Sequence, residues 1–234
     1  MRLLVSPINK EEAIIASKGG ADIVDVKNPK EGSLGANFPW IIKEIKEAVN
    51  GKQPISATIG DFNYKPGTAA LAAFGAAVAG ADYIKVGLYD IQTQEQAYEL
   101  LTTITRAVKD YDPKKKVVAS GYSDYKRINS ISPFLLPAVA AEAGADVVMV
   151  DTAIKDGKST FEFMDENELK KFTELAHEYG LENAIAGSLR FEDLPLLERI
   201  SPDIIGVRGM VCGGDRKTAI RQDLVEKLAA ECQA

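Results

Sequence analysis

One eight-residue pattern occurs three times in the chain, and a weaker copy occurs a fourth time. Each copy is a turn followed by an aspartate and a run of mostly apolar residues, as in Gly20-Ala-Asp22-Ile-Val-Asp25-Val-Lys27. The other copies are centred on Asp82, Asp146 and Asp203, so the aspartates lie 60, 64 and 57 residues apart. A repeat of this length predicts two strand-and-helix units for each copy.

Short β-branched runs alternate with helical patterns along the whole chain, which indicates parallel strands joined by helices. Eight such units in 234 residues favour an α/β fold of the closed (β/α)₈ type, a TIM barrel, which typically needs about 250 residues. The alternative is an open, doubly wound sheet, but the Gly-x-Gly-x-x-Gly motif of its dinucleotide-binding form is missing. A single domain over residues 1–234 is predicted, because no linker-like segment divides the chain. Strands are predicted at 2–6, 22–27, 55–60, 82–87, 117–121, 146–151, 183–188 and 203–208, and helices near 10–18, 38–49, 67–79, 94–110, 133–143, 165–179, 192–199 and 216–231.

Composition excludes several classes of protein. No apolar run approaches the ~20 residues of a membrane helix, and the N-terminus turns polar too early for a secretory signal, so a cytoplasmic protein is expected. A net charge of −6 and a pI near 5.0 argue against nucleic-acid binding. Cys212 and Cys232 cannot form a disulfide framework, and His177 is the only histidine. No metal site is predicted, and any catalysis must depend on lysine and carboxylate side chains.

The repeat also predicts which side chains point into the barrel. Side chains alternate faces along a strand, and alternate strands fill the same interior layers of a TIM barrel. Charged residues then appear only in the two layers nearest the carboxyl ends of the strands, where barrel enzymes place their active sites. Gly87 is expected to leave space above Lys85. The predicted layers are Ile23, Tyr83, Val147 and Ile204; then Asp25, Lys85, Met149 and Gly206; then Lys27, Gly87, Asp151 and Arg208.

Two lysines and two aspartates inside a barrel must either pair or change their pKa values, because unpaired buried charges are costly. One interpretation is a structural network that fills the barrel. The other is a Schiff-base site, in which desolvation and a second cation lower the pKa of a lysine and free its amine to attack a carbonyl. Lys27 and Lys85 would supply the paired cations. Asp25 and Asp151 would orient them and move protons.

The last two strands end in segments that suit a phosphate. Loops after strands 7 and 8 of a TIM barrel commonly bind phosphate, since glycine backbone N–H groups approach the anion closely and arginine binds it with two hydrogen bonds. Cys212 within the second segment is expected to pack rather than react. The predicted phosphate-binding residues are Gly187, Ser188, Arg208, Gly209, Gly213 and Gly214.

Two further loops leave predicted strands beside the charged layers. The loop of residues 28–39 follows Lys27 and is long for its position, so it is expected to act as a lid or to contact the substrate. The segment after Asp151 carries Lys155, which could reach over the mouth to a phosphate or carboxylate. Phe38 and Trp40 are expected to pack on the barrel exterior or at an interface.

Several of these segments together resemble the (5-formylfuran-3-yl)methyl phosphate synthase family, found in methanogenic archaea with relatives in methylotrophic bacteria. The resemblance runs from the first strand to the last helix, with no departure at the charged positions. The matching segments are Lys27-Asn-Pro-Lys-Glu-Gly-Ser-Leu-Gly-Ala-Asn-Phe-Pro39, Lys65-Pro-Gly-Thr68, Asp82-Tyr-Ile-Lys-Val-Gly-Leu-Tyr89, Asp151-Thr-Ala-Ile-Lys-Asp-Gly-Lys158 and Gly206-Val-Arg-Gly209.

The resemblance implies a TIM barrel lyase of methanofuran biosynthesis that needs no cofactor. In this reaction two glyceraldehyde 3-phosphates condense to a furan aldehyde phosphate, also named 4-(hydroxymethyl)-2-furancarboxaldehyde phosphate, with loss of phosphate and water. It implies Lys27 as the Schiff-base residue, Lys85 as the proton-transfer residue, and Asp25, Asp151 and Lys155 as supporting catalytic or binding groups. A triose phosphate is then expected to bind as the substrate. The chain is also expected to form a homo-oligomer and to have no membrane or nucleic-acid partner.

Two other functions remain open at this point. A different class I aldolase or triose-phosphate enzyme would share the Schiff base and the phosphate site. A non-catalytic sugar-phosphate-binding barrel would bind the ligand without turnover.

Overall fold

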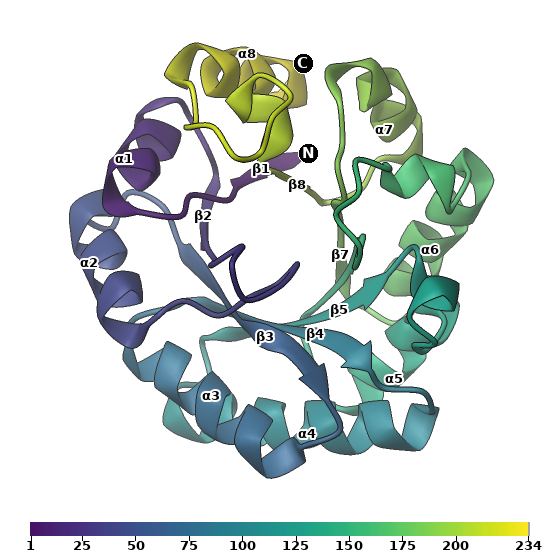
Figure 1. The fold of residues 1–234 in the computed structure, drawn as a ribbon. Helices are drawn as coiled ribbons and strands as arrows, with labels where there is room; N and C mark the ends of the chain where they lie inside the picture. The colour runs from purple at the N-terminus through teal and green to yellow at the C-terminus, as the bar shows by residue number, and fades with distance from the viewer. Residues whose placement is uncertain (234) are drawn as a thin grey trace.

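The computed structural model describes residues 1–233 as a closed barrel of eight parallel strands surrounded by eight α-helices (Figure 1). Each strand pairs with its neighbours in sequence, and β8 closes the barrel against β1. The predicted (β/α)₈ fold is therefore confirmed. The strands are β1 (Arg2–Val5), β2 (Ile23–Val26), β3 (Ile55–Asn63), β4 (Tyr83–Asp90), β5 (Lys116–Tyr122), β6 (Val147–Asp151), β7 (Glu182–Ile185) and β8 (Ile204–Val207).

The helices follow the predicted positions, with one clear difference at the end of the chain. The predicted helix from residue 216 begins only at Gln222, because carbonyl groups of the preceding loop accept hydrogen bonds from the Arg208 side chain instead of from a helix. The helices are α1 (Lys10–Lys18), α2 (Pro39–Val49), α3 (Pro66–Val78), α4 (Gln94–Tyr111), α5 (Leu136–Glu142), α6 (Glu166–Glu178), α7 (Leu194–Ile200) and α8 (Gln222–Gln233), with a 3₁₀ helix η5 (Gly209–Cys212) after β8.

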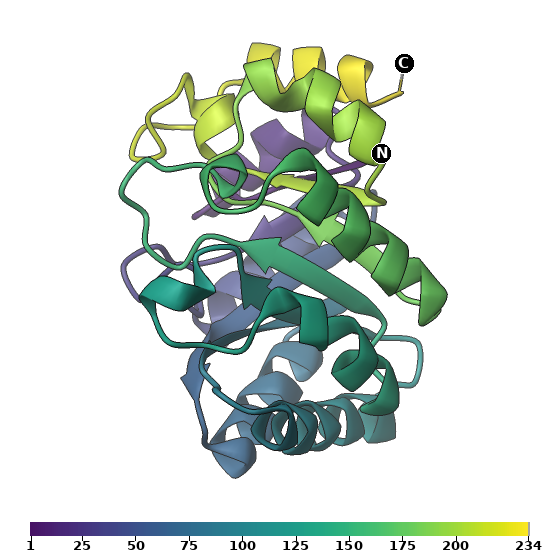
Figure 2. The same ribbon diagram turned by 90° about the vertical axis from the view of Figure 1, so that its right-hand side faces the viewer.

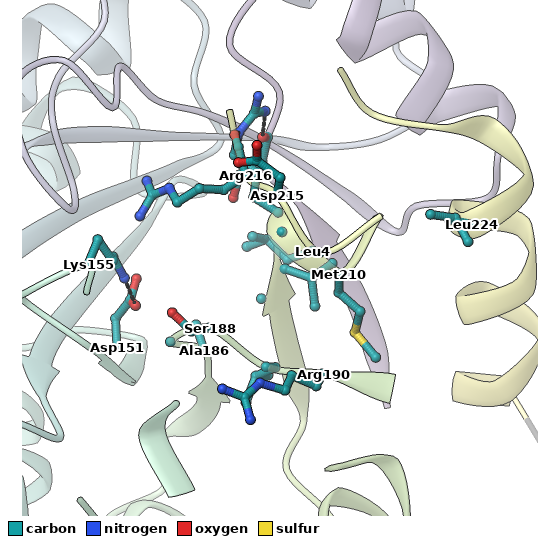
Figure 3. Close-up of a pocket in the computed structure, with 18 of the residues that line it drawn as sticks. Leu4, Asp151, Lys155, Ala186, Ser188, Arg190, Met210, Asp215, Arg216 and Leu224 are labelled. Atoms are coloured by element: carbon teal, nitrogen blue, oxygen red, sulfur yellow. Dashed lines mark hydrogen bonds and ion pairs between the residues drawn. The ribbon is translucent and has the colours of Figure 1, made fainter. Parts of the chain in front are cut away.

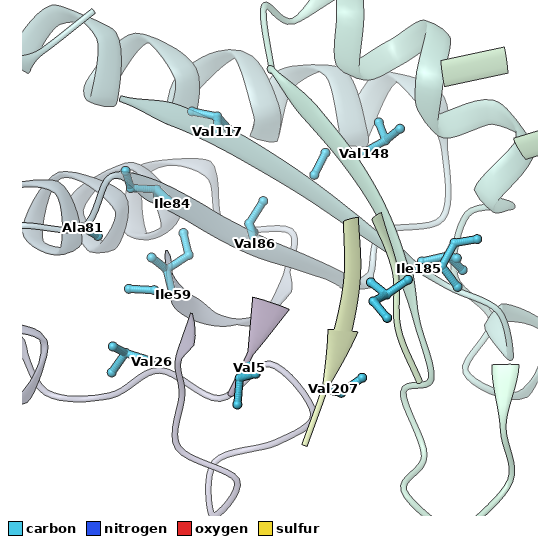
Figure 4. Close-up of a cluster of buried hydrophobic side chains, with 14 of the residues drawn as sticks. Val5, Val26, Ile59, Ala81, Ile84, Val86, Val117, Val148, Ile185 and Val207 are labelled. Carbon is cyan, nitrogen blue, oxygen red and sulfur yellow. The ribbon is translucent and has the colours of Figure 1, made fainter. Parts of the chain in front are cut away.

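The apolar core has two parts, one on each side of the barrel wall. The larger part lies between strands and helices, where outward-facing side chains such as Val26, Val86 and Ile185 meet the inner faces of the helices (Figure 4). The smaller part fills the barrel itself, as the repeat predicts. Its members are Leu4, Ile23, Tyr83, Val118, Val147, Met149, Ala184, Ala186 and Ile204.

The aspartate that defines each repeat binds the strand before it. Oδ2 of Asp82 accepts the backbone N–H of Ile55 at 2.7 Å, and Oδ2 of Asp146 accepts that of Val117 at 2.8 Å. Asp22 and Asp203 do the same at β1 and β7. The repeat therefore ties neighbouring strands together at their amino ends, the face of a TIM barrel that serves stability.

Replacing Asp82 by alanine is expected to lower the free energy of unfolding by about 2 kcal/mol, because it leaves the buried N–H of Ile55 without an acceptor. The change also removes the partner of the Lys46 ammonium, 2.6 Å away. Urea denaturation measures the effect. Asp110→Ala is the matched control, since the Asp110–Arg106 pair is exposed on both sides and its loss should cost at most about 0.5 kcal/mol. Equal losses in the two variants would contradict the assigned role of the repeat.

The long loops that follow the strands lie together at one end of the barrel, the mouth (Figure 2). On one side of the mouth β3 and β4 continue past their neighbours, and a register shift between Thr58 and Asp61 bends β3 there. The loop of residues 28–39 folds inward over the same side (Figure 1). No helix of the described residues is long and apolar enough to cross a membrane.

Candidate functional site

The main cavity, of about 670 Å³, opens at the mouth of the barrel, within the range of sites for small molecules. Its lining residues come from 4–27 and from 149–224, that is, from β1, β2 and β6–β8 with their loops. The predicted residues Asp25, Lys27, Asp151 and Lys155 all line it. Lys85 does not border this cavity.

Asp25 and Lys85 form an ion pair inside the barrel. The Lys85 ammonium donates to both carboxylate oxygens at 2.9 Å, and the Ser6 and Ser56 hydroxyls donate to the same carboxylate at 3.0 and 2.6 Å. Lys85 is only 1% exposed. Burial alone would raise the pKa of Asp25, but the charges of Lys85 and Lys27 and the hydrogen bonds outweigh it and lower this pKa. Asp25 is thus ionised, and both of its carboxylate oxygens accept hydrogen bonds from neighbouring side chains.

Lys27 lies one layer above this pair and is different, since its ammonium forms no hydrogen bond or ion pair with residues 1–233. It is 7% exposed and borders the cavity. Burial lowers the pKa of Lys27 to about 8; Asp151 and Asp25 raise it, and the charges of Lys85 and Lys155 lower it. About a tenth of this amine is therefore uncharged at pH 7, far more than for an ordinary lysine with a pKa near 10.4.

Asp151 and Lys155 lie across the cavity from the loop after β8 (Figure 3). Oδ1 of Asp151 accepts hydrogen bonds from the Lys155 ammonium and from the Thr152 N–H, while Oδ2 is buried without a partner. Burial tends to raise the pKa of Asp151, but the charges of Lys155 and Lys27 lower it to about 2. Oδ2 is therefore a charged acceptor with no donor, in a position to receive one from a bound molecule.

The side chains of Tyr122, Asp61 and Leu34, the last from the loop of residues 28–39, fill the space that Gly87 was expected to leave above Lys85. A Cβ atom at Gly87 would lie 2.2 Å from the Tyr122 hydroxyl and 3.0 Å from Cδ1 of Leu34. The loop is fixed there because the Ser33 hydroxyl donates to the Thr152 carbonyl at 2.8 Å and the Leu34 N–H donates to Asp61. The expectation of open space over Lys85 was wrong: glycine is required because this side of the mouth is closely packed.

The position of the Arg208 side chain does not fit the prediction that it binds a phosphate directly. Its guanidinium turns toward α1, where it forms a buried ion pair with Glu12 at 2.7 Å. Its remaining N–H groups donate to the carbonyls of Ser6, Arg216 and Thr218. All five donors of Arg208 are thus engaged, and the side chain shapes the loop that precedes α8.

The predicted glycines at the mouth fall into two groups. The N–H groups of Gly187 and Ser188, and the Ser188 hydroxyl, form no hydrogen bond with the described residues and border the cavity. Gly187 has φ +101°, and a Cβ there would lie 2.2 Å from the Thr160 hydroxyl, so the turn needs glycine. Gly213 and Gly214 direct their N–H groups back to the carbonyl of Gly209, which leaves these two without a free donor. The phosphate-binding role of Gly187, Ser188 and Gly209 stays a prediction.

Arg216, the predicted first residue of the last helix, lies before α8 and lines the cavity. Its side chain extends over the cavity toward Lys155, with the Ser188 hydroxyl facing the same space (Figure 3). The guanidinium is half-buried and forms no hydrogen bond with residues 1–233, and burial lowers its pKa. The carbonyl of Arg216 accepts a hydrogen bond from Nε of Arg208 at 2.8 Å, so Arg208 helps to hold Arg216 at the cavity.

Ser6 and Ser56 were also missed, although the same counting could have found them. Ser6 directly follows β1, and Ser56 lies on β3 opposite Asp25 in the register of β2 and β3. No three His, Cys, Asp or Glu side chains of residues 1–233 are grouped so that they could hold a metal ion.

Known proteins resemble the chain closely in sequence. The model of the family described as 4-HFC-P synthase matches residues 3–229. A protein of Methanosarcina acetivorans named (5-formylfuran-3-yl)methyl phosphate synthase is 87% identical over the full length of both chains. Proteins with the same name are 59% identical in Archaeoglobus fulgidus, over 97% of each chain, and 55% identical in Methanocaldococcus jannaschii, over both full lengths.

Solved structures resemble the chain in fold alone. A 3-hexulose-6-phosphate synthase superposes with a TM-score of 0.68 at 18% identity, covering 99% of each chain. An N-(5'-phosphoribosyl)anthranilate isomerase from Pyrococcus furiosus superposes with a TM-score of 0.65 at 16% identity, covering 100% of this chain and 98% of the isomerase.

Proposed function

The chain belongs to the 4-HFC-P synthase family, and on that premise we propose that it condenses two glyceraldehyde 3-phosphates into (5-formylfuran-3-yl)methyl phosphate through a Schiff base on Lys27. Loss of one phosphate and two waters balances the atoms of this lyase reaction, which would serve methanofuran biosynthesis. The observation that carries the proposal is the Lys27 amine: it borders the cavity, has no partner among the described residues, and has a pKa of about 8.

The first chemical step needs this uncharged amine. Lys27 attacks the aldehyde carbon of one triose phosphate, and water leaves to give an iminium ion that draws electrons from the neighbouring C–H bond. Removal of that proton gives an enamine, which expels the phosphate from the third carbon of the same triose and leaves an enol. The third carbon of this enol forms a carbon–carbon bond with the second carbon of the other triose, which first isomerises to its ketone form. The ring closes through the terminal hydroxyl of that second triose, two waters leave to give the furan, and hydrolysis of the imine releases the product.

The remaining charged groups would handle protons and hydroxyls. Lys85 touches Asp25 and does not border the cavity, so it would exchange protons with the substrate through that carboxylate. Asp151 offers its unpaired Oδ2 to a substrate hydroxyl or to the water that leaves. A group that hydrogen-bonds the reacting atoms in this way contributes typically 10²–10⁴-fold in rate.

Phosphate would bind between the turn after β7 and the loop before α8. The free N–H groups of Gly187 and Ser188 lie on one side of the cavity. Arg216 and Lys155 face the same space and supply positive charge (Figure 3). This set keeps Gly187 and Ser188 from the predicted one, replaces Arg208 by Arg216 and adds Lys155, and it does not include Gly209, Gly213 and Gly214.

Arg216→Ala is expected to lower kcat/KM by roughly 10- to 100-fold, mostly through KM, because charge-assisted hydrogen bonds contribute about 1.5–3 kcal/mol. Its stability should hardly change, since the side chain has no partner among residues 1–233. Steady-state kinetics and urea denaturation measure the two effects. Arg199→Ala is the control, as the Arg199–Glu166 pair lies on the outer helices. A larger change in kcat than in KM would argue against phosphate binding by Arg216.

The expected pH dependence of kcat/KM follows from the lowered pKa of Lys27. Only the uncharged amine attacks, so kcat/KM is expected to rise about tenfold per unit up to pH 8 and then to level off. An unshifted lysine would continue the rise to about pH 10. Rates should be measured from pH 7 upward, because the substrate phosphate itself titrates near 6. A profile that still climbs at pH 9.5 would contradict the assignment.

The proposal is tested with purified protein and glyceraldehyde 3-phosphate alone. A conjugated furan aldehyde should appear in the ultraviolet spectrum as phosphate is released, and borohydride should fix an adduct on the peptide that contains Lys27. A reversible aldol product without this absorbance would instead identify another class I aldolase. Binding with neither product nor adduct would identify a non-catalytic barrel.

A further inference from the structure

The turn after β7 has a backbone that its sequence alone would not favour. Gly187 has φ +101° and Ser188 has φ +52°, and the left-handed region is uncommon for a residue that carries a side chain. Ala186 and Ser188, on either side of the glycine, both lie at the wall of the main cavity (Figure 3). Such a conformation persists only where surrounding contacts hold it, so the groups that bind this turn decide its shape.

Thr160 binds the turn without bordering the cavity. Its hydroxyl donates to the Ala186 carbonyl at 2.6 Å, and its backbone N–H donates to the Gly187 carbonyl at 2.9 Å. The residue is fully buried and is not among those that line the cavity. Thr160 therefore lies behind the turn and binds two consecutive carbonyl groups of it.

These two hydrogen bonds also fix the directions of the N–H groups of the turn. In a planar trans peptide the carbonyl and the N–H point in opposite directions, and the peptide bonds on both sides of Gly187 are trans. The Gly187 N–H shares a peptide with the Ala186 carbonyl, and the Ser188 N–H shares one with the Gly187 carbonyl. Both N–H groups therefore point away from Thr160, and neither forms a hydrogen bond with the described residues.

The position of Thr160 is itself fixed from two sides. It is the first residue of the 3₁₀ helix η3 (Thr160–Glu162), so its N–H has no acceptor within that helix and is free to bind the turn. On the other side the Ser123 hydroxyl lies 3.2 Å from the Thr160 hydroxyl and 3.2 Å from the Asp151 carbonyl. Thr160 thus connects the turn after β7 with the ends of β5 and β6.

We propose that Thr160 is a positioning residue for phosphate binding, which aims the N–H groups of Gly187 and Ser188 at a phosphate of the substrate. The inference rests on the proposed function, because it requires phosphate to bind at this turn. Consecutive backbone N–H groups in a turn can form an anion-binding concavity, and an error of roughly 1 Å in such a site can cost about 100-fold in rate. Thr160 itself touches no substrate and takes part in no chemical step.

Thr160→Val tests the inference, because it replaces the hydroxyl by a methyl group of similar size. A carbon atom approaches a carbonyl oxygen to roughly 3.3 Å, whereas the hydroxyl lies at 2.6 Å, so the turn must shift. We expect the dissociation constant of inorganic phosphate, measured by titration calorimetry, and the KM for glyceraldehyde 3-phosphate each to rise about tenfold, with a smaller change in kcat. Thr160→Ser keeps the hydroxyl and should return both constants to near their wild-type values.

Thr173→Val is the matched control, since Thr173 is also a buried threonine whose hydroxyl donates to a backbone carbonyl, that of Leu169 in α6. The same hydroxyl accepts from the Asn183 side chain near the amino end of β7, away from the mouth. Both valine variants should lose stability in urea, but only Thr160→Val should lose affinity for phosphate. Equal losses of affinity in the two variants, or a larger change in kcat than in KM for Thr160→Val, would overturn the inference.

The same titrations separate this inference from the proposed function. Phosphate that binds wild type and Thr160→Val with equal affinity would overturn the positioning role alone. Wild-type protein that binds no phosphate would overturn the phosphate site of the proposed function together with it.

Hydrogen exchange of the peptide that contains residues 186–190 gives a measurement that needs no turnover. Phosphate should slow the exchange of the Gly187 and Ser188 amides in wild type and in Thr160→Ser, and should protect them much less in Thr160→Val at the same concentration. If Thr160→Val fails to fold, Thr160→Ala, which has no atom in place of the hydroxyl, replaces it in both measurements. Equal protection with and without the hydroxyl would contradict the inference.

Discussion

Lys27→Met is expected to lower turnover at least a thousandfold and at the same time to stabilise the protein. The loss corresponds to ~4 kcal/mol of barrier, because no other lysine of the described cavity has an unpaired amine at the same place. Methionine keeps the length of the side chain and removes the buried charge. Borohydride should then fix no adduct on the variant.

The gain in stability follows from the same pKa. Folding lowers the pKa of Lys27 from 10.5 to about 8, so the unfolded chain binds more protons and the charged form costs up to about 3 kcal/mol below pH 8. That cost decreases between pH 8 and 10.5. Lys27→Met should therefore unfold at higher urea concentration than wild type at pH 7, with a smaller difference at pH 10.

The control for both effects is Lys52→Met, a change at an exposed lysine in the turn before β3. It should alter neither turnover nor stability by a measurable amount. A Lys27→Met protein that is clearly less stable than wild type at pH 7 would show that this amine is satisfied in the folded state, which would remove the basis of its reactivity.

Asp25→Asn is expected to lower the free energy of unfolding by about 3–5 kcal/mol, because it leaves the buried Lys85 ammonium without a countercharge. The amide has nearly the same shape, so packing changes little. Activity should fall at least about a hundredfold, as expected when a proton-transfer group is lost. Calorimetry and steady-state kinetics measure the two losses.

A second substitution separates charge from shape at this position. In the double variant Asp25→Asn, Lys85→Met, the unpaired charge is gone, so most of the lost stability should return while activity stays low. Ser56→Ala, which removes one hydrogen bond to the same carboxylate, should cost only about 1 kcal/mol. If Asp25→Asn cost no more than Ser56→Ala, the ion pair would not be the group that holds this layer together.

Counting along the repeat was enough to predict the fold and the inner layers of the barrel. Strand periodicity is a local property, so one register relation places Asp25 against Lys85 and brings Ile23 and Val147 into the same interior cluster, as the structure confirms. The same logic extends to Ser56 on the neighbouring strand, but it requires alignment of odd strands with even ones, which the repeat itself does not supply.

The residues at the rim could not be predicted in this way. Arg208 has a long side chain at the end of β8, and its direction is decided by Glu12 on α1, 196 residues earlier. The start of α8 depends on that arginine in turn. Gly87 faces the loop of residues 28–39, whose path is fixed by Ser33 and Asp61. These outcomes depend on contacts between loops, which no local periodicity encodes.

The inward fold of the loop of residues 28–39 has a consequence for how molecules enter and leave. Leu34 is fully buried and the Ser33 hydroxyl donates to the Thr152 carbonyl across the mouth, so contacts within the protein hold this half of the entrance in place. A mobile flap would lose roughly 1–2 kcal/mol of entropy per residue at each binding event, whereas here that ordering happens once, during folding. The cavity lies instead beside β1, β2 and β6–β8, so under the proposed function both triose phosphates would enter and leave on that side of the mouth.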